Sequence, residues 1–217
     1  MIQPMIIRTA AALLLGCFSL SAIAQAECNK KVYLTFDTGN MSVAEKVAEI
    51  LKRQNVKATF FLANEKTFRG DFSLDDSWKG YWQERVKEGH HFGSHTYDHT
   101  YFVKDGPKGE VFERPQFGPK AGMTILYNEA AMCREIRRVD VRFQELTDHP
   151  IQKIWRAPGG KTSPTLIRMG DLCGYQHIGW APAGFLGDEL NSDKHPNAML
   201  WKKPAGISRM AISLWPT

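Results

Sequence analysis

The sequence lacks the features that mark membrane, nucleic-acid-binding and repeat proteins. Beyond the first 26 residues no apolar run approaches the ~20 residues that a bilayer span needs, so we expect no stable membrane span. The 28 basic and 23 acidic residues are interspersed, without a basic arm or stripe, so we expect no nucleic-acid partner. Internal repeats and low-complexity stretches are absent, which excludes a repeat architecture.

Cysteine is scarce, with four residues in 217, and its spacing fits no zinc ribbon. The helical metalloprotease pattern H-E-x-x-H is also missing. Cys28, Cys133 and Cys173 follow the N-terminal segment, and their odd number forbids complete internal pairing. The sequence therefore allows either one disulfide with a free thiol or three free thiols.

Residues 1–26 have the pattern of an export signal. Arg8 supplies the positive start, 9–23 form a short apolar run, and small residues at 22–26 suit signal peptidase. Cys17 lies in a weak lipoprotein-like box, but the apolar run continues past it, so we expect no lipid anchor there. We therefore predict an exported protein, periplasmic or extracellular, with one domain over residues 27–200.

Strand and helix patterns alternate along this domain. Apolar and β-branched runs predict strands over 31–36, 58–63, 91–95, 154–156 and 176–180. Helical periodicity predicts helices over 43–53, 82–88, 124–146 and 163–172. Residues 101–123 are rich in Pro and Gly without periodicity, and predict a long surface loop or an insertion. The alternation indicates an α/β fold with a parallel sheet covered by helices.

Polar side chains follow three of the predicted strands, at the position where barrel enzymes place their active sites. They are Asp37, the pair His95 and His99, and Arg156. The four-residue spacing keeps both imidazoles on one side in extended or helical backbone, and imidazole suits zinc and related ions. Each cluster also has an ordinary interpretation: chance histidines, an Asx-turn cap at Asp37, and a structural salt bridge at Arg156.

Taken together, these residues resemble the polysaccharide deacetylases, the NodB homology domain of carbohydrate esterase family four (CE4). T-F-D-T-G at 35–39 looks like the first family motif, T-F-D-D-G. S-H-T-Y-D-H at 94–99 looks like the second motif, and R-A-P-G at 156–159 like the third. The resemblance implies a distorted (β/α) barrel, here incomplete at its C-terminal end. It also implies a metal-dependent hydrolase that removes N-acetyl groups from chitin-like or peptidoglycan-like amino sugars.

The same resemblance implies roles for individual residues. Asp37 would be the general base and Arg156 the residue that orients it. His95 and His99 would bind a divalent metal, with zinc as the first expectation and cobalt or manganese as alternatives. The expected partner is an acetylated amino-sugar polymer or oligosaccharide.

Three further residues are implied on the substrate side. Pro158, in the third motif, would border the substrate, and Trp180 would line the acetyl pocket or else pack in the core. Asp188 is a loose match to the fourth motif, which supports the base through the arginine.

The first departure from the family pattern is Thr38, which stands where the family has its second aspartate, the third metal ligand. A neutral hydroxyl binds divalent ions more weakly than a carboxylate does. Metal affinity should therefore fall unless Asp37, Asp98 or His91 shifts into the gap.

The second departure is at the end of the chain. No sequence of the fifth-motif type, D-I-x-L-x-H, follows Trp180, so the histidine that protonates the leaving amine is missing. Residues 201–217 look like an irregular tail, whose codons in another frame permit Asp-Ile-Ser-Leu-Ala-His. We therefore hypothesise a frameshift upstream of Ala211, which sequencing of the coding DNA would test.

Two other functions stay open at this point. One is a catalytically impaired, carbohydrate-binding relative of the same fold, and the other is an amidase for a small non-sugar amide. Acetate release from chitooligosaccharides, measured beside binding of the same sugars, separates a binding module from an enzyme.

Overall fold

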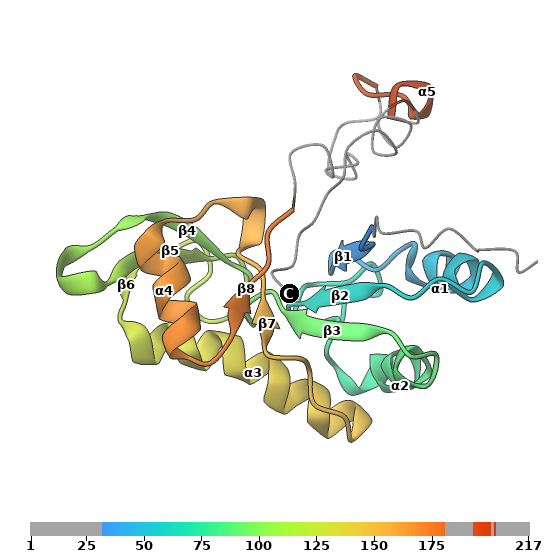
Figure 1. The fold of residues 1–217 in the computed structure, drawn as a ribbon, viewed down its shortest axis with the longest axis horizontal. Coiled ribbons are helices and arrows are strands. Elements are labelled where there is room, and N and C mark those ends of the chain that lie inside the picture. Colours follow the sequence, from blue (N-terminus) through green and yellow to red (C-terminus); the bar gives the residue numbers. More distant parts are fainter. Residues whose placement is uncertain (1–31, 181–192, 201, 203–217) are drawn as a thin grey trace, which may run out of the picture.

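The computed structural model describes residues 32–180, 193–200 and 202 (Figure 1). The predicted leader over 1–26, Cys28, Asp188 and the tail from 201 onward, apart from Lys202, lie outside the described residues. Among the helices that are described, none is long and apolar enough to span a bilayer.

Five parallel strands form the main sheet, in the order β1-β2-β3-β7-β8 (Figure 1). They are β1 (Thr35–Asp37), β2 (Thr59–Leu62), β3 (His91–Ser94), β7 (Ile154–Trp155) and β8 (Gln176–His177). Because each neighbouring pair is parallel, the carboxyl ends of all five strands lie along one edge. The predicted α/β fold is therefore confirmed. Within the described residues the sheet stays open, with β1 and β8 as its outer strands.

Within the described residues the helices are α1 (Ala44–Arg53), α2 (Lys79–Lys87), α3 (Glu129–Thr147), α4 (Pro164–Leu172) and the short α5 (Asn197–Leu200). Helix α5 lies apart from the sheet (Figure 1). In α1 the buried residues Ala44, Ala48 and Leu51 recur at helical spacing, which gives the helix one apolar face. α3 contacts α2, α4 and β3, so it covers the middle of the sheet (Figure 1).

An aromatic cluster fills the space between the sheet, α2 and α3. The rings of Phe92 on β3 and Phe143 on α3 have centroids 4.5 Å apart. Trp82 of α2 packs edge-on against both and donates its Nε1–H to the carbonyl oxygen of Ser73 at 2.7 Å. Large aromatic side chains bury much apolar area each, so this cluster is a main source of stability for the layer that carries the site.

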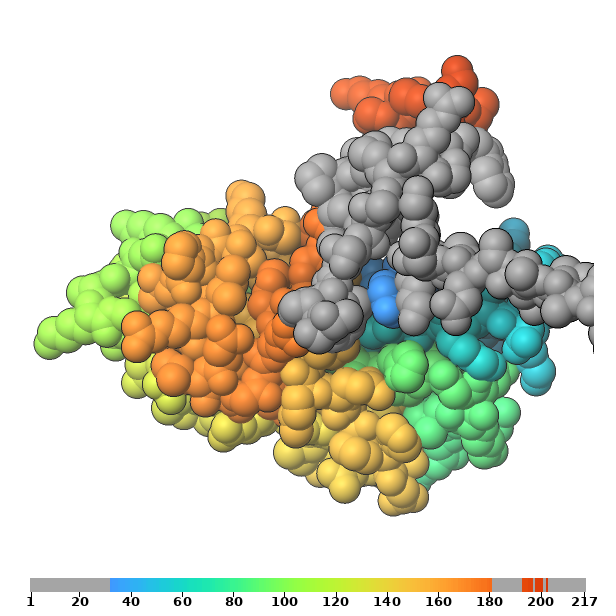
Figure 2. All heavy atoms as spheres, viewed as in Figure 1, coloured from blue at the N-terminus to red at the C-terminus, as the bar shows by residue number. Residues whose placement is uncertain are grey.

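The prediction of a surface loop over 101–123 is wrong. This region forms most of a three-stranded antiparallel sheet, β4 (Thr100–Asp105), β5 (Val111–Pro115) and β6 (Ile125–Tyr127), in the order β4-β5-β6. In β5 the buried positions alternate as strands require, but one of them is Glu113, so no apolar alternation is visible in the sequence. The sheet lies at the end of the molecule beside α4 (Figures 1 and 2).

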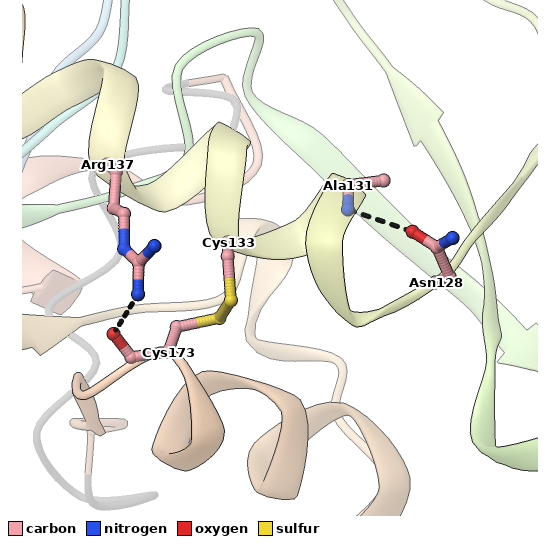
Figure 3. Close-up of a disulfide and its surroundings, with 5 residues drawn as sticks. All are labelled: Asn128, Ala131, Cys133, Arg137 and Cys173. Carbon is pink, nitrogen blue, oxygen red and sulfur yellow. Dashed lines mark hydrogen bonds between the residues drawn. A yellow bond between two sulfur atoms is a disulfide. The ribbon is translucent and has the colours of Figure 1, made fainter.

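The helix predicted over 124–146 begins later than expected, because β6 takes its first residues. α3 starts after Asn128, whose side chain accepts a hydrogen bond from the backbone N–H of Ala131 at 3.0 Å (Figure 3). It ends at Asp148, which has the left-handed conformation typical of a helix C-cap.

A disulfide joins α3 to the residue that follows α4 (Figure 3). Cys133 and Cys173 form it, and Arg137 donates a hydrogen bond to the carbonyl oxygen of Cys173 at 3.1 Å. The sequence allowed either one disulfide or three free thiols, and the structure has the disulfide. The covalent link fixes α4, and through it β8, against the long central helix.

Candidate active site

The three polar clusters predicted from the sequence meet at the carboxyl edge of the main sheet. Asp37 ends β1, His95 follows β3 directly, and Arg156 follows β7 directly. Nη1 of Arg156 lies 2.7 Å from Oδ1 of Asp37, and Nε2 of His95 lies 3.7 Å from Oδ2 of the same carboxylate. Residues 119 positions apart in the chain therefore share one site.

Arg156 is held from several sides. Its Nε–H donates to the carbonyl oxygen of Ile178 at 3.0 Å, and Nη2 donates to that of Gly179 at 3.3 Å. Nη1 also donates to Oγ1 of Thr35 at 3.0 Å. The guanidinium lies 4.1 Å from the centroid of the Phe61 ring, within cation–π range. A planar cation fixed in this way can orient the Asp37 carboxylate.

The hydrogen bond of His95 sets its tautomer. Nδ1 lies 3.0 Å from the carbonyl oxygen of Arg156, which can only accept, so Nδ1 carries the proton. Nε2 then presents a lone pair toward Asp37. Burial is the main cause that lowers the pKa of His95, so the ring is neutral at neutral pH.

His99 is adjacent to His95 and is also buried. The two ring centroids are 4.9 Å apart. Burial, followed by the repulsion that a protonated His95 would exert, lowers the pKa of His99 to about 3, so this imidazole is neutral as well. Its Nδ1 is buried without a hydrogen-bond partner among the described residues. Buried polar atoms are rarely left unpaired, and metal binding is one reason for an exception.

The histidines are brought together by a strained turn, not by the extended or helical backbone considered from the sequence. Thr96, with φ 61°, and His99, with φ 49°, both have the left-handed conformation. For a β-branched residue this conformation is a true outlier. Oγ1 of Thr96 accepts a hydrogen bond from the N–H of Thr100 at 2.8 Å, which holds the turn. Strain of about 1–3 kcal/mol per such residue is typical of functional sites.

The two imidazoles fit a divalent metal, but position 38 does not complete the ligand set. In the described part of the chain, no three His, Cys, Asp or Glu side chains are grouped to hold one ion. The Thr38 hydroxyl accepts from the N–H of Ala63 at 2.8 Å, and its proton can be donated to Oε1 of Glu65 at 3.0 Å or to the carbonyl oxygen of Ala63 at 3.3 Å. The Thr38 hydroxyl is therefore hydrogen-bonded to the residues that follow β2. These bonds occupy most of its capacity, so it is a poor candidate for a metal ligand.

The sequence also offered Asp98 and His91 as substitutes, and neither lies at the site. Asp98 turns toward α3, where Oδ2 accepts from Nη1 of Arg138 at 3.1 Å. His91 begins β3, at the opposite end of the strand from His95, and its ring pairs with Gln152. A shift of either into the ligand gap is therefore excluded by the fold.

Aromatic rings cover the glycine of the third motif, Gly159, and the glycine that follows it, Gly160. A Cβ at Gly160 would lie 2.6 Å from the Trp180 indole, and one at Gly159 would lie 3.0 Å from the ring of Tyr101. Both glycines have positive φ, 65° and 66°, so only glycine suits this close approach. Pro158 is buried in the 3₁₀ turn Pro158–Gly160.

Tyr101 and His177 are two residues near the site that the sequence analysis did not single out. Tyr101 packs edge-on against His99, with centroids 4.9 Å apart, and it was hidden by the incorrect loop prediction. Nε2 of His177 accepts from the N–H of Ala157 at 3.2 Å, so it braces the turn after Arg156. Burial lowers the pKa of His177 to about 4, which keeps it neutral and able to accept.

Comparison with known proteins identifies the family. A family model described as polysaccharide deacetylase matches residues 24–178. The chain belongs to the polysaccharide deacetylase family. Solved structures of this family share the fold: a CE4 domain of a multidomain xylanase from the hindgut metagenome of Trinervitermes trinervoides has a TM-score of 0.56 at 20% identity. The alignment covers 82% of this chain and 68% of that one.

Further proteins similar to this chain extend the comparison. A CE4 pseudoenzyme from Bacillus anthracis has a TM-score of 0.54 at 16% identity, over 86% of this chain and 53% of that one. The peptidoglycan-N-acetylglucosamine deacetylase PgdA of Listeria monocytogenes is 36% identical over 93 residues, which are 42% of this chain and 18% of PgdA. An uncharacterised 30.6 kDa protein of Geobacillus stearothermophilus is 25% identical over 166 residues, which are 76% of this chain and 51% of that protein. The chain thus matches between a fifth and a half of the length of these curated relatives.

Two predictions are confirmed by these findings, namely the polysaccharide deacetylase resemblance and the α/β fold. The structure brings Asp37, His95, His99 and Arg156 together as expected. The roles assigned to these four residues stay predictions.

Proposed function

We propose that this chain is a metal-dependent hydrolase that removes N-acetyl groups from an amino-sugar polymer, either peptidoglycan-like or chitin-like. The observation that carries the proposal is the convergence of Asp37, His95 and Arg156 within hydrogen-bonding or near-contact distance at the carboxyl edge of the sheet. The name of the Listeria relative, a peptidoglycan-N-acetylglucosamine deacetylase, favours a peptidoglycan-like substrate.

His95 and His99 would hold the divalent ion, with zinc as the first choice and cobalt or manganese as alternatives. When bound, the ion supplies Lewis acidity to the acetamide carbonyl and to the attacking water. Burial keeps both imidazoles neutral, and the hydrogen bond from Nδ1 of His95 to Arg156 fixes the ring in the orientation that a ligand needs.

Asp37 would accept the proton of the attacking water. Oδ1 is bonded to Arg156, which leaves Oδ2, on the His95 side, as the basic atom. Arg156 would hold this carboxylate in one orientation, because its own position is fixed by backbone carbonyls. General-base groups placed in this way contribute ~10²–10⁴-fold to rate.

Tyr101 and Trp180 would border the substrate on the side of the third motif, with Pro158 forming the rigid base of that turn. Flat aromatic faces suit the apolar faces of sugar rings and an acetyl methyl group. The proposed role of Asp188 concerns a residue outside the described part of the chain.

An exported location suits this function, since a polymer of the cell wall lies outside the cytoplasm. The disulfide Cys133–Cys173 supports the proposal, because disulfides persist in oxidising compartments and are rare in the cytosol. The basic side chains outnumber the acidic ones by 28 to 23, which favours weak attraction to anionic surfaces.

Acetate release tests the proposal. Purified protein is incubated with peptidoglycan fragments and with chitooligosaccharides, with and without added zinc, cobalt or manganese, and sugar binding is measured in parallel. We expect metal-dependent release that Asp37→Asn reduces by about 10²-fold or more, while binding persists. Release that is unchanged in Asp37→Asn would contradict the assigned base.

The engaged Thr38 hydroxyl favours a second candidate, a carbohydrate-binding relative with impaired metal chemistry. Binding of the sugars without acetate release at any metal concentration would identify it. Hydrolysis of small non-sugar amides without action on sugars would instead identify the third alternative, an amidase.

A further inference from the structure

Two further aromatic side chains extend the site beyond His99. The ring of Phe117, which follows β5, packs against the ring of His99 with centroids 6.5 Å apart. Phe72 lies in the segment between β2 and α2, and it packs edge-on against Phe117 with centroids 6.2 Å apart. Tyr101 packs against the same imidazole at 4.9 Å. A continuous row of rings therefore runs from Tyr101 through His99 to Phe117 and Phe72.

The exposure of Phe72 and Phe117 is unlike that of core residues. Both side chains are half-buried, whereas His99 is buried. Single apolar side chains on a protein surface are normal, but these two contact one another and one of them also packs against a residue of the site. Their ring planes meet at 88°, so the pair forms a corner with one ring as its floor and the other as its wall.

The backbone that carries each ring is fixed by hydrogen bonds. The N–H of Phe117 donates to the carbonyl oxygen of Asp98 at 3.1 Å, which ties this segment to the turn that carries His99. The N–H of Phe72 donates to Oδ2 of Asp75 at 2.8 Å. Because both rings are held before any ligand arrives, a ligand that packs on them orders little of the protein and loses little of the contact energy as entropy.

We infer that Phe72 and Phe117 form a second sugar subsite, which binds the sugar residue next to the one whose acetamide is hydrolysed. The apolar face of a sugar ring suits an aromatic corner of this kind. The inference rests on the proposed function and narrows its substrate class, because a second subsite beside the first favours a chain of linked amino sugars over a free monosaccharide. Since apolar rings build the subsite, sugar binding there does not require a metal ion.

The experiment measures sugar binding by calorimetric titration of the full chain with Asp37→Asn, which suppresses turnover. The probes are N-acetylglucosamine and chitooligosaccharides of increasing length. We expect affinity to increase from the monosaccharide to the oligomers. Phe117→Ala should weaken oligomer binding about fivefold and leave monosaccharide binding unchanged. Phe117→Leu keeps the apolar volume without a flat face and should lose as much, whereas Phe117→Tyr should keep the oligomer affinity.

A matched control separates the subsite from a general loss of packing. Phe112 is also a half-buried phenylalanine, but it lies toward the other end of β5, where it contacts Lys104. Phe112→Ala should bind oligomers like the parent protein. Circular dichroism confirms that each variant is folded.

The failure of this inference differs from the failure of the proposed function. If affinity does not increase with sugar length, or if Phe117→Ala weakens all sugars equally or none of them, the subsite is overturned, and acetate release by the wild type still supports the hydrolase. If oligomer binding depends on Phe117 while the wild type releases no acetate, the subsite stands and the proposed hydrolase is overturned. If the protein binds no sugar of any length, the subsite is overturned.

Discussion

The ring of Tyr101 packs edge-on against the ring of His99, with centroids 4.9 Å apart. Tyr101 belongs to β4, whereas His99 belongs to the turn after β3, so the small antiparallel sheet contributes directly to the wall of the proposed site. Tyr101→Ala should raise KM for oligosaccharides about fivefold, because it removes an aromatic face worth about 1 kcal/mol. Tyr101→Phe keeps the face and should behave like the wild type in the same acetate-release assay. Equal KM values for the two variants would contradict a substrate contact.

Arg156→Lys keeps the charge at this position but should reduce acetate release by about 10²-fold. A lysine ammonium cannot reach Asp37 and the carbonyl oxygens of Ile178 and Gly179 with the geometry of a guanidinium, so the base loses its fixed orientation. The measurement is kcat for acetate release, with urea unfolding to check stability. Wild-type kcat in a folded Arg156→Lys protein would show that orientation by this residue is unimportant.

Replacing Thr38 by Asp should destabilise the metal-free protein by about 1–3 kcal/mol. The new carboxylate would lie close to that of Glu65, whose Oε1 is 3.0 Å from the present hydroxyl, and two buried like charges repel. Adding Glu65→Gln should recover most of the loss. Urea unfolding in the presence of a chelator measures both variants, and a Thr38→Asp protein as stable as the wild type would argue against close contact of the two side chains.

Much of this site was predictable from sequence because its parts are local signals. Asp37 ends an apolar strand, His95 and Arg156 directly follow one, and parallel strands bring their carboxyl ends to one edge. The partner of Thr38 was not predictable, since Glu65 is 27 positions away and its contact depends on the path of the loop after β2. The small sheet was missed because Glu113 occupies a buried strand position.

Glu113 makes protein stability depend on pH. Burial raises the pKa of this carboxyl from 4.5 to about 8, so the folded protein keeps a proton that the unfolded chain releases. The contribution of protonated Glu113 to the free energy of unfolding is therefore fully present below pH 4.5, and it is lost as the pH rises toward 8. Relative to the wild type, Glu113→Gln should gain about 1.4 kcal/mol of unfolding free energy per pH unit in this window. Urea titrations at several pH values test this, and parallel curves for the two proteins would refute it.

Removing the disulfide should lower stability by about 2–4 kcal/mol. Cys133 and Cys173 are separated by 40 residues, for which loop-closure entropy predicts about 4 kcal/mol as an upper value. The double variant Cys133→Ala/Cys173→Ala should unfold at lower urea concentration than the wild type. Dithiothreitol should lower the wild-type midpoint and leave that of the double variant unchanged. Equal sensitivity of both proteins would mean that the bridge does not form in solution.

Only one of the hydrogen bonds of the Arg156 side chain goes to Asp37, and the others go to Thr35 and to the backbone of Ile178 and Gly179. If Asp37 is protonated during a reaction cycle, the guanidinium loses one ionic partner and keeps its remaining anchors. The cation therefore stays in place while the charge opposite it changes, and the dipoles of the site need no reorganisation between one turnover and the next.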